Sequence, residues 1–334
     1  MKKLLTIVVP TYNTEKYLSR CIDSLIVPEF MDCLEILIVN DGSLDGSLAL
    51  AYQYEKLYPL TVSVINKKNG GHGSTINVGI ERAQGKYFRV LDSDDWFDTA
   101  EFKAYLNELS SMDVDMVLGH STRELVYENC SQPLEYKGIE FGKIYTADRF
   151  DYSNFPADKF IILANVTYLT EVLRRSNLKL YEKCFYVDVQ YSSFVFLKVK
   201  TFTFSSHNVY RYFIGRPEQS VSVNGFRKNF EHHRRVMLSC AQYLMDNNLT
   251  NSQLANVKWL YDSLMEKCCR QYVMAARYMK FLDAVKESQL YSKALQNISP
   301  QIYNQISKYS FGIRLIRINM WLGIIAIKLR SKIS

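Results

Sequence analysis

Residues 86–97 read KYFRVLDSDDWF, an apolar run followed by three carboxylates in four positions. The run up to Leu91 has the β-branched and aromatic side chains that are typical of a buried strand. Asp92, Asp94 and Asp95 then follow at its carboxyl end. Clustered like charges are stable only if a divalent cation, basic neighbours or protonation of one member offsets them. This stretch therefore predicts a polar site at the tip of a strand.

The same strand pattern recurs through the first 120 residues, where it alternates with helical periodicity. Such alternation predicts βαβ units around a mainly parallel sheet, which binds ligands beyond the carboxyl ends of its strands. We therefore predict an α/β fold in which three polar motifs share one edge: PTYN at 10–13, NDGSLD at 40–45 and LDSDDW at 91–96. The expected strands are 4–9, 34–39, 61–65, 86–91 and 115–119, and the expected helices are 16–26, 47–57, 75–83 and 99–109.

The rest of the chain differs in character from this first part. Residues 120–225 are mixed, with short strands and a helix near 164–175. Residues 230–245 and 254–279 have the spacing and the helix formers of long helices, and Pro and Gly become rare. We therefore expect an α/β domain at 1–225 and a smaller α-helical domain at 226–334.

Composition excludes several classes of protein. The 334 residues are 48% hydrophobic and 22% charged, which is enough to bury a core and unlike a disordered chain. No apolar run approaches the roughly 20 residues of a membrane span, and the run after the first lysines is shorter than that of a signal peptide. The seven cysteines form no CxxC pair, which favours a reducing compartment. We therefore expect a cytoplasmic protein.

The Asp92-Ser93-Asp94 triplet has the hard oxygen ligands that Mg²⁺ and Mn²⁺ prefer. These ions commonly also hold phosphates, so with few protein ligands the metal would need oxygens from a bound diphosphate. The alternative is an acidic loop without a metal that leads into the next helix. In that case Asp98, just before TAEF, would serve only as a helix N-cap.

Four stretches, in order, resemble the family 2 glycosyltransferases of the GT-A fold. They are TIVVPTYNTEKYLSRCIDSL, ILIVNDGSLDGS, NGGHGSTINVGIERAQGKYFRVLDSDDWF and YVDVQYSSFVF, and the resemblance covers about residues 4–225. It implies a Rossmann-like GT-A catalytic domain that needs Mn²⁺ or Mg²⁺. It also implies an inverting transfer of one sugar from a UDP-sugar to a hydroxyl of a glycan acceptor on a protein, a polysaccharide or a lipid carrier.

The resemblance also implies a role for individual residues at the donor site. Pro10, Tyr12 and Asn13 would line the pocket of the nucleotide base, and Asp41 would accept a hydrogen bond from the uracil N–H. Further along, Asp92 would face the ribose, Asp94 would ligate the metal, and Asp95 would position the donor sugar or the metal's water.

The general base that the family needs would be Asp188. The family commonly supplies this base in a Glu-Asp pair, and this chain has Val187-Asp188 at that position. The surrounding CFYVDVQYSSFVF is aromatic and apolar, and we expect it to desolvate the carboxylate and raise its pKa. The alternative is that Asp188 only caps a helix.

Two other departures from the family pattern concern the phosphates and the metal. Where the family usually has Ala-Arg-Asn, this chain reads Thr75-Ile76-Asn77, so Asn77 remains a donor ligand while the phosphate charge must be met elsewhere. His72 is a candidate contact to the donor, and Arg211 or Arg216 could meet the diphosphate. His207 would be the additional metal ligand that GT-A enzymes often recruit. An ordinary polar loop is the alternative for each of these residues.

The basic character of the chain belongs to its last part. The net charge is +7, and residues 250–334 hold 13 Lys and Arg against 4 Asp and Glu. Read as one helix, residues 311–334 place Arg314, Arg317, Lys328 and Lys332 within about 60° of one another. Such a basic, Trp-containing helix can lie at an anionic membrane surface, at the inner face of the cell membrane. It could instead dock on the catalytic domain or on a partner subunit, and nothing in the pattern indicates nucleic acid.

Two further functions remain as alternatives to the glycosyltransferase. A sugar nucleotidyltransferase would also use acidic metal ligands, but it would need a Gly-rich phosphate loop after the first strand, where PTYNTEKY has no glycine. A catalytically inactive family member could act as a binding or scaffold subunit, although the metal acids and a candidate base are all present. The chain lacks the QxxRW motif of processive synthases, which favours the transfer of a single sugar.

Overall fold

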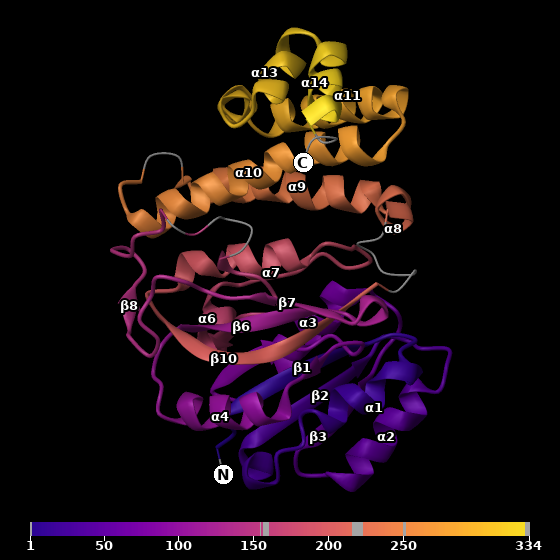
Figure 1. The fold of residues 1–334 in the computed structure, drawn as a ribbon, viewed down its shortest axis with the longest axis vertical. Coiled ribbons are helices and arrows are strands. Elements are labelled where there is room, and N and C mark those ends of the chain that lie inside the picture. The colour runs from indigo at the N-terminus through magenta and orange to yellow at the C-terminus, as the bar shows by residue number, and fades with distance from the viewer. Residues whose placement is uncertain (1, 154, 156–159, 216–222, 250–251, 331–334) are drawn as a thin grey trace. The chain divides into compact units, whose positions relative to one another are not determined.

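The protein, in a computed structural model that describes residues 2–153, 155, 160–215, 223–249 and 252–330, consists of two compact units. The first unit comprises 1–150 and 161–216, and the second comprises 151–160 and 217–334. The first is a mixed α/β unit and the second is helical, which confirms the predicted α/β fold class with a smaller helical part (Figure 1). The exact domain limits at 225 and 226 stay a prediction.

A single ten-stranded sheet organises the first unit. Its strands follow the order β3-β2-β1-β4-β9-β6-β10-β5, with β7 beside β6 and β8 beside β10. The bounds are β1 Leu5–Thr11, β2 Leu34–Asn40, β3 Val62–Asn66, β4 Tyr87–Val90, β5 Trp96–Phe97, β6 Met116–Leu125, β7 Cys130–Leu134, β8 Tyr145–Thr146, β9 Val166–Leu169 and β10 Thr201–Ile214.

The sheet is parallel only in part. β3, β2, β1 and β4 are parallel neighbours, and so are β6 and β10, whereas β9 is antiparallel to both β4 and β6. The prediction of a mainly parallel sheet therefore holds, and the antiparallel pairs are those made by β5, β7, β8 and β9. β9 also occupies part of the segment near 164–175 that the sequence predicts as a helix.

The register of the parallel strands places the three polar motifs at one edge. Thr11 pairs with Asn40, and Val8 pairs with Val90. Every residue of β1, β2 and β4 is buried, because helices cover both faces of this part of the sheet. The chain segments that follow these strands therefore emerge side by side.

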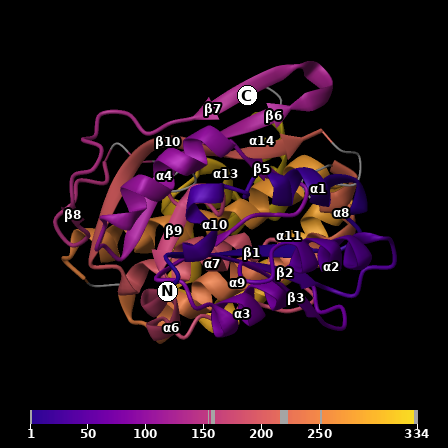
Figure 2. The same ribbon diagram turned by 90° about the horizontal axis from the view of Figure 1, so that it is seen from below.

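Helices flank the sheet on both sides (Figures 1 and 2). Figure 1 shows α4 on one side and α3 and α7 on the other, and Figure 2 shows α1 and α2 beside β2 and β3. Asp98 caps α4 by accepting a hydrogen bond from the Glu101 N–H at 3.1 Å, as the sequence suggests. The helices are α1 Glu15–Asp23, α2 Ser47–Leu57, α3 His72–Arg82, α4 Thr99–Ser110, α6 Thr170–Arg175 and α7 Asp188–Phe194, with short 3₁₀ helices at Pro28–Cys33, Val126–Glu128 and Phe196–Lys198.

The second unit is a helical bundle. Its helices are α8 Val223–Lys228, α9 Phe230–Asp246, α10 Ala255–Tyr278, α11 Phe281–Ile298, α12 Pro300–Gln305, a 3₁₀ helix at Ile306–Lys308, α13 Phe311–Ile318 and α14 Met320–Arg330. The long helices expected at 230–245 and 254–279 are confirmed as α9 and α10. Within the part of the chain that the structure describes, no helix combines the length and the apolar character needed to cross a membrane.

The C-terminal segment is two helices and not one. The chain leaves helical geometry at Asn319 (φ −150°), and α13 then packs against α14. A Cβ on Gly323 would lie 2.4 Å from the Ile316 backbone nitrogen, so the two helices meet at backbone distance. The predicted arc of four basic residues on a single helix is therefore wrong, and one of the four, Lys332, lies outside the described residues.

Candidate active site

The three carboxylates after β4 have three different environments. Asp92 is half-buried, and its Oδ1 lies 2.7 Å from His72 Nε2. Asp94 is also half-buried, and its backbone carbonyl accepts a hydrogen bond from Arg20 Nη2 at 2.8 Å. Asp95 is only 1% exposed. The basic side chains of His72 and Arg20 thus offset part of the negative charge of this cluster.

Asp95 connects the cluster to β10. Its Oδ2 accepts a hydrogen bond from the Tyr210 hydroxyl at 2.6 Å, and its Oδ1 accepts one from the Phe213 N–H at 2.8 Å. Burial, followed by the charge of Asp92, raises the pKa of Asp95 well above its ordinary value. With both oxygens engaged inside the protein, Asp95 supports the site and leaves Asp92 and Asp94 as its accessible acids.

Arg20 supplies a positive charge that the sequence did not associate with this cluster. Its guanidinium lies 3.8 Å from the centre of the Trp96 ring, a cation–π contact, while it also donates to the Asp94 carbonyl. Arg20 is 74 positions from Asp94 in sequence, so only the tertiary fold brings the two together.

His72 stands at the centre of the acidic groups. It is the first residue of α3, in the glycine-rich turn 70–73, and it pairs with Asp92. Burial alone would lower the pKa of His72, but the charges of Asp92, Asp188 and Asp41 outweigh that effect and raise it. A cationic His72 would reduce the negative charge where a diphosphate has to bind.

The glycine-rich turn also holds the segment that carries Asp188. The Lys183 N–H donates to the Gly70 carbonyl at 2.5 Å, and a Cβ on Gly73 would lie 2.3 Å from the Tyr181 carbonyl oxygen. Asn77 fixes the same segment, because its amide donates to the Leu180 carbonyl at 3.0 Å and its Oδ1 accepts from the Leu180 N–H at 2.9 Å. Asn77 thus holds the segment around Leu180 in place, a contact that the sequence alone does not reveal.

Asp188 begins α7 and is accessible to solvent. Its carboxylate does not cap the helix, since Val187 occupies the N-cap position and no side chain caps this helix end. Desolvation by the surrounding protein raises its pKa, the charge of His72 opposes this shift, and Asp92 adds to it. The expected direction of the pKa shift is therefore confirmed, and Asp188 lies in the same electrostatic cluster as His72 and Asp92.

The residues predicted for the base pocket follow β1 and β2. Pro10 lies inside β1, while Tyr12 is 47% exposed just beyond the strand end. Asn13 adopts a left-handed conformation (φ 52°), and its Oδ1 accepts a hydrogen bond from the Leu44 N–H at 2.8 Å. Tyr12 therefore presents an open aromatic surface, and Asn13 shapes the turn beside it.

Asp41 directly follows β2 and is 2% exposed. Its Oδ1 accepts hydrogen bonds from Lys67 Nζ at 2.6 Å and the Gly70 N–H at 2.8 Å, and its Oδ2 accepts one from the Gly71 N–H at 2.7 Å. Each carboxylate oxygen has about two acceptor positions, so Oδ2 keeps capacity for one more donor such as a uracil N–H. Asp41 also fixes the turn that carries His72.

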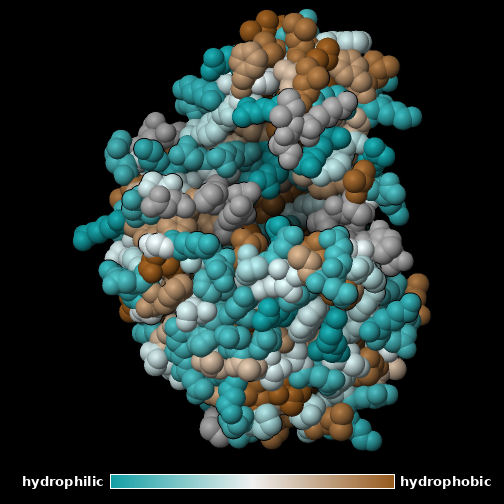
Figure 3. Space-filling model, in the orientation of Figure 1, coloured by the Kyte–Doolittle hydropathy of each residue, from teal (hydrophilic) through white to brown (hydrophobic). Residues whose placement is uncertain are grey.

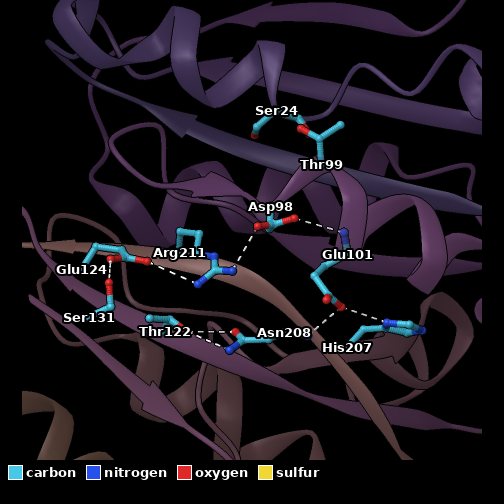
Figure 4. A network of polar contacts seen from close by, with 10 residues as sticks. All are labelled: Ser24, Asp98, Thr99, Glu101, Thr122, Glu124, Ser131, His207, Asn208 and Arg211. Atoms are coloured by element: carbon cyan, nitrogen blue, oxygen red, sulfur yellow. Dashed lines mark hydrogen bonds and ion pairs between the residues drawn. The ribbon is translucent and has the colours of Figure 1, made fainter.

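Two predicted residues lie elsewhere, in the network of Figure 4. His207 Nδ1 lies 2.9 Å from Glu101 Oε2, and its Nε2 is 3.9 Å from Glu108 Oε2. On β10, His207 precedes Tyr210 and Phe213, the two residues that contact Asp95, by three and six positions. The contacts of the His207 ring are to α4, and its role as a metal ligand stays a prediction.

Arg211 belongs to the same network. Its guanidinium pairs with Asp98 at 3.0 Å and with Glu124 at 3.3 Å (Figure 4). Two carboxylates thus already compensate the positive charge of Arg211, which the sequence suggested as a partner of the diphosphate. The other candidate, Arg216, lies outside the described residues.

The side chains of this site could supply only some of the ligands that a divalent metal ion needs. Among the residues that the structure describes, no group of three or more His, Cys, Asp or Glu side chains could hold a metal ion. Mg²⁺, however, is usually bound through one or two carboxylates together with substrate phosphates. The half-buried Asp94, two positions from Asp92, fits that mode of binding.

Several known proteins are similar to this chain in sequence. Residues 6–153 match the family described as Glycosyl transferase family 2. GlyA, a glycosyltransferase of Streptococcus pneumoniae, is 30% identical over 183 residues, which are 46% of this chain and 26% of that protein. EpsJ, an uncharacterized glycosyltransferase of Bacillus subtilis, is 38% identical over 117 residues, 35% of this chain and 33% of that protein. The chain thus spans a third or less of the length of these two relatives.

A solved structure has the same fold over nearly the whole chain. The crystal structure of S. aureus TarS 1–349 superposes with a TM-score of 0.68 and covers 98% of this chain and 91% of that chain at 16% sequence identity. At that identity the likeness concerns the fold alone. The family match supports the resemblance drawn from the motifs: residues 6–153 are similar to glycosyl transferase family 2.

Proposed function

We propose that the protein is an inverting, metal-dependent glycosyltransferase that moves one sugar from a UDP-sugar to a hydroxyl of a glycan acceptor. The observation that carries this proposal is the close pair of Asp92 and His72 at the carboxyl edge of the sheet, whose charges also act on the accessible carboxylate of Asp188. Such edges bind nucleotides in α/β proteins, and a carboxylate with a raised pKa is suited to act as a general base.

The donor would bind along the tips of β1, β2 and β4. Tyr12 offers its exposed ring to the base, Asp41 offers Oδ2 to the uracil N–H, and Asp92 accepts from the ribose. The fold is also that of S. aureus TarS 1–349, for which a complex with UDP-GlcNAc has been solved (TM-score 0.64, 16% identity). This likeness supports a UDP-sugar as the donor.

The chemical step would be a direct displacement at the anomeric carbon. The acceptor oxygen attacks this carbon, Asp188 takes the hydroxyl proton, the bond from the carbon to the diphosphate oxygen breaks, and UDP leaves with that electron pair. Attack from the opposite side inverts the configuration. A Mg²⁺ or Mn²⁺ ion held by Asp94 and the diphosphate would supply charge stabilisation of the leaving group. His72, at the N-terminus of α3, would add positive charge on the same side.

The experiment that tests this function is the release of UDP from a panel of UDP-sugars with Mn²⁺ present. We expect at least one UDP-sugar to be turned over, EDTA to stop the reaction, and Asp94→Asn to abolish it. Asp113→Asn is the matched control, because this aspartate is 90% exposed and outside the site. If no UDP-sugar is turned over or bound, the proposal is wrong and a non-catalytic role gains support.

A further inference from the structure

The last helix of the second unit is apolar on almost every side, but only one strip of it is buried. Gly323, Ile324 and Ile327 pack inward. Four other large apolar side chains remain in solvent. They are Trp321 (51% exposed), Leu322 (54%), Ile325 (42%) and Leu329 (59%). At roughly 100° per residue these four fall within an arc of about 100°, and we call this surface the α14 face.

The neighbouring helix continues the same apolar character. On α13, Phe311 is 65% exposed and Ile318 is 77% exposed, and the exposed Arg314 lies within about 60° of both. Figure 3 shows apolar atoms gathered where Figure 1 labels α13 and α14. Contiguous apolar surface of this kind marks an interaction site.

The charge of this region indicates what the surface meets. After Glu287 the chain contains seven Lys and Arg residues and no Asp or Glu. Among them Arg314 is exposed on α13, and Arg330 is exposed at the end of α14. A second copy of this chain would bring the same positive charge against itself, and like charges across an interface are unfavourable. An anionic lipid surface complements both the charge and the apolar side chains.

We propose that the hairpin of α13 and α14 binds the surface of an anionic membrane, with the α14 face inserted at the level of the lipid headgroups. Trp is favoured at that depth, since its ring is apolar and its N–H is polar. The basic residues would remain with the lipid phosphates, and each contributes attraction that salt screens. This inference does not depend on the proposed enzymatic function.

The experiment is sedimentation of the full chain with phosphatidylcholine vesicles that either contain or lack phosphatidylglycerol. We expect binding only to the anionic vesicles and a decrease as salt is raised. The triple variant Trp321→Ser/Ile325→Ser/Leu329→Ser should lower the partition coefficient by at least about tenfold, because three apolar side chains no longer leave water. The matched control is Leu57→Ser/Leu60→Ser, which removes exposed leucines (68% and 80%) from the first unit and should bind as before.

A second readout reports on the depth of the α14 face. Lipids brominated on their acyl chains should quench tryptophan fluorescence in the wild type, and Trp321→Phe should lose most of that quenching while still binding. The proposal is overturned if the wild type ignores anionic vesicles, or if the triple variant binds them as well as the wild type does. It is also overturned if the triple variant instead dissociates a dimer of the free protein.

Discussion

Asp95 and Asp188 both have raised pKa values, but their surroundings suit them to different work. Asp95 is buried, and both of its oxygens accept hydrogen bonds from β10. Asp188 stays accessible while the surrounding protein desolvates it. A general base has to reach the proton of a substrate, and Asp188 alone of these two can do so. The pair shows that a pKa shift indicates a catalytic group only when access accompanies it.

The first prediction concerns Asp188→Asn. The amide keeps the shape of the side chain but cannot take a proton, so sugar transfer should slow by at least ~100-fold while UDP-sugar binding stays about the same. The raised pKa means that the carboxyl stays protonated to a higher pH than an ordinary aspartate, so the wild-type rate should fall as the pH is lowered through that raised value. The variant should lack this acid limb.

Single-turnover rates and calorimetric titration with UDP measure the two quantities separately. Glu182→Gln is the control, since this exposed residue lies in the same segment but has no proposed role. A near wild-type rate in Asp188→Asn would remove it as the base, and Asp92 would be tested next.

At this scale the sequence predicted the acids but not their partners. Asp41, Asp92, Asp94 and Asp188 could be named because strand ends and family motifs mark them. Arg20, Lys67 and Tyr210 could not be assigned, because they reach the site through contacts over 26 to 115 positions of sequence. Local periodicity carries no information about such pairings.

Among the elements, the turn at 70–73 is the one that most clearly positions another segment of the chain. It supports the segment 180–184 through backbone contacts that leave no room for a side chain. Asn77 holds the same segment from within α3. The three elements α3, the 180–184 segment and α7 therefore set the distance between the donor site and Asp188.

Gly73→Ala tests this role. Its new Cβ would lie 2.3 Å from the Tyr181 carbonyl oxygen, so the 180–184 segment has to shift. A displacement of about 1 Å in a catalytic group can cost ~100-fold in rate, and we expect kcat to fall by about that amount while UDP binding changes little. Gly119→Ala is the control, since its nearest neighbour would be at 3.4 Å, an ordinary contact. Unchanged kcat in Gly73→Ala would mean that this segment does not position Asp188.

A buried histidine makes the packing of α9 against α10 sensitive to acid. His233 lies against Phe226 and Phe230, and its Nδ1 is hydrogen bonded to Gln271, whose amide donates to Glu287. Burial lowers its pKa from 6.5 to about 4, with the charge of Arg270 acting in the same direction. In the unfolded chain, His233 therefore takes up a proton below about pH 6.5. In the folded chain it stays neutral until the pH falls to about 4.

The stability of the second unit should consequently be complete above about pH 6.5 and fall by up to about 3 kcal/mol as the pH approaches 4. Urea unfolding at a series of pH values measures this loss. His233→Gln should reduce the pH dependence, whereas the neighbouring His232→Gln should keep it. An equal slope in His233→Gln and the wild type would place the acid sensitivity elsewhere.

The C-terminal hairpin shows where element prediction fails. Residues 311–330 have helical character throughout, so periodicity favours one helix. The break at Asn319 is set by tertiary packing, because Gly312 and Gly323 allow α13 and α14 to pack closely against each other. A similar reason explains β9, which pairs with β4 and β6 although its sequence continues into the helix α6.

On the scale of the whole molecule, the two units differ in charge, and we propose a different task for each. The first unit contains the acidic cluster at the edge of its sheet, and residues 250–334 of the second unit carry 13 Lys and Arg against 4 Asp and Glu. The proposed donor carries a diphosphate, which would bind the first unit through a metal ion. The proposed membrane surface carries lipid phosphates, which would bind the basic side chains of the second unit directly. The two kinds of phosphate binding should therefore respond differently to chelators.

The last prediction uses this difference. A ligand that binds only the folded state at about 100 times its Kd adds about 2.7 kcal/mol of stability. For a first unit of roughly 200 residues, UDP with Mn²⁺ should raise the melting temperature by roughly 5–10 °C. EDTA should abolish this rise, and so should Asp94→Asn, because both remove the link between the diphosphate and the protein. Calorimetry measures the shift, and Asp113→Asn should retain it.

Binding to anionic vesicles should persist in EDTA, since no metal takes part there. If EDTA leaves the UDP-induced rise unchanged, the diphosphate is held by side chains alone, and His72 becomes the first residue to test.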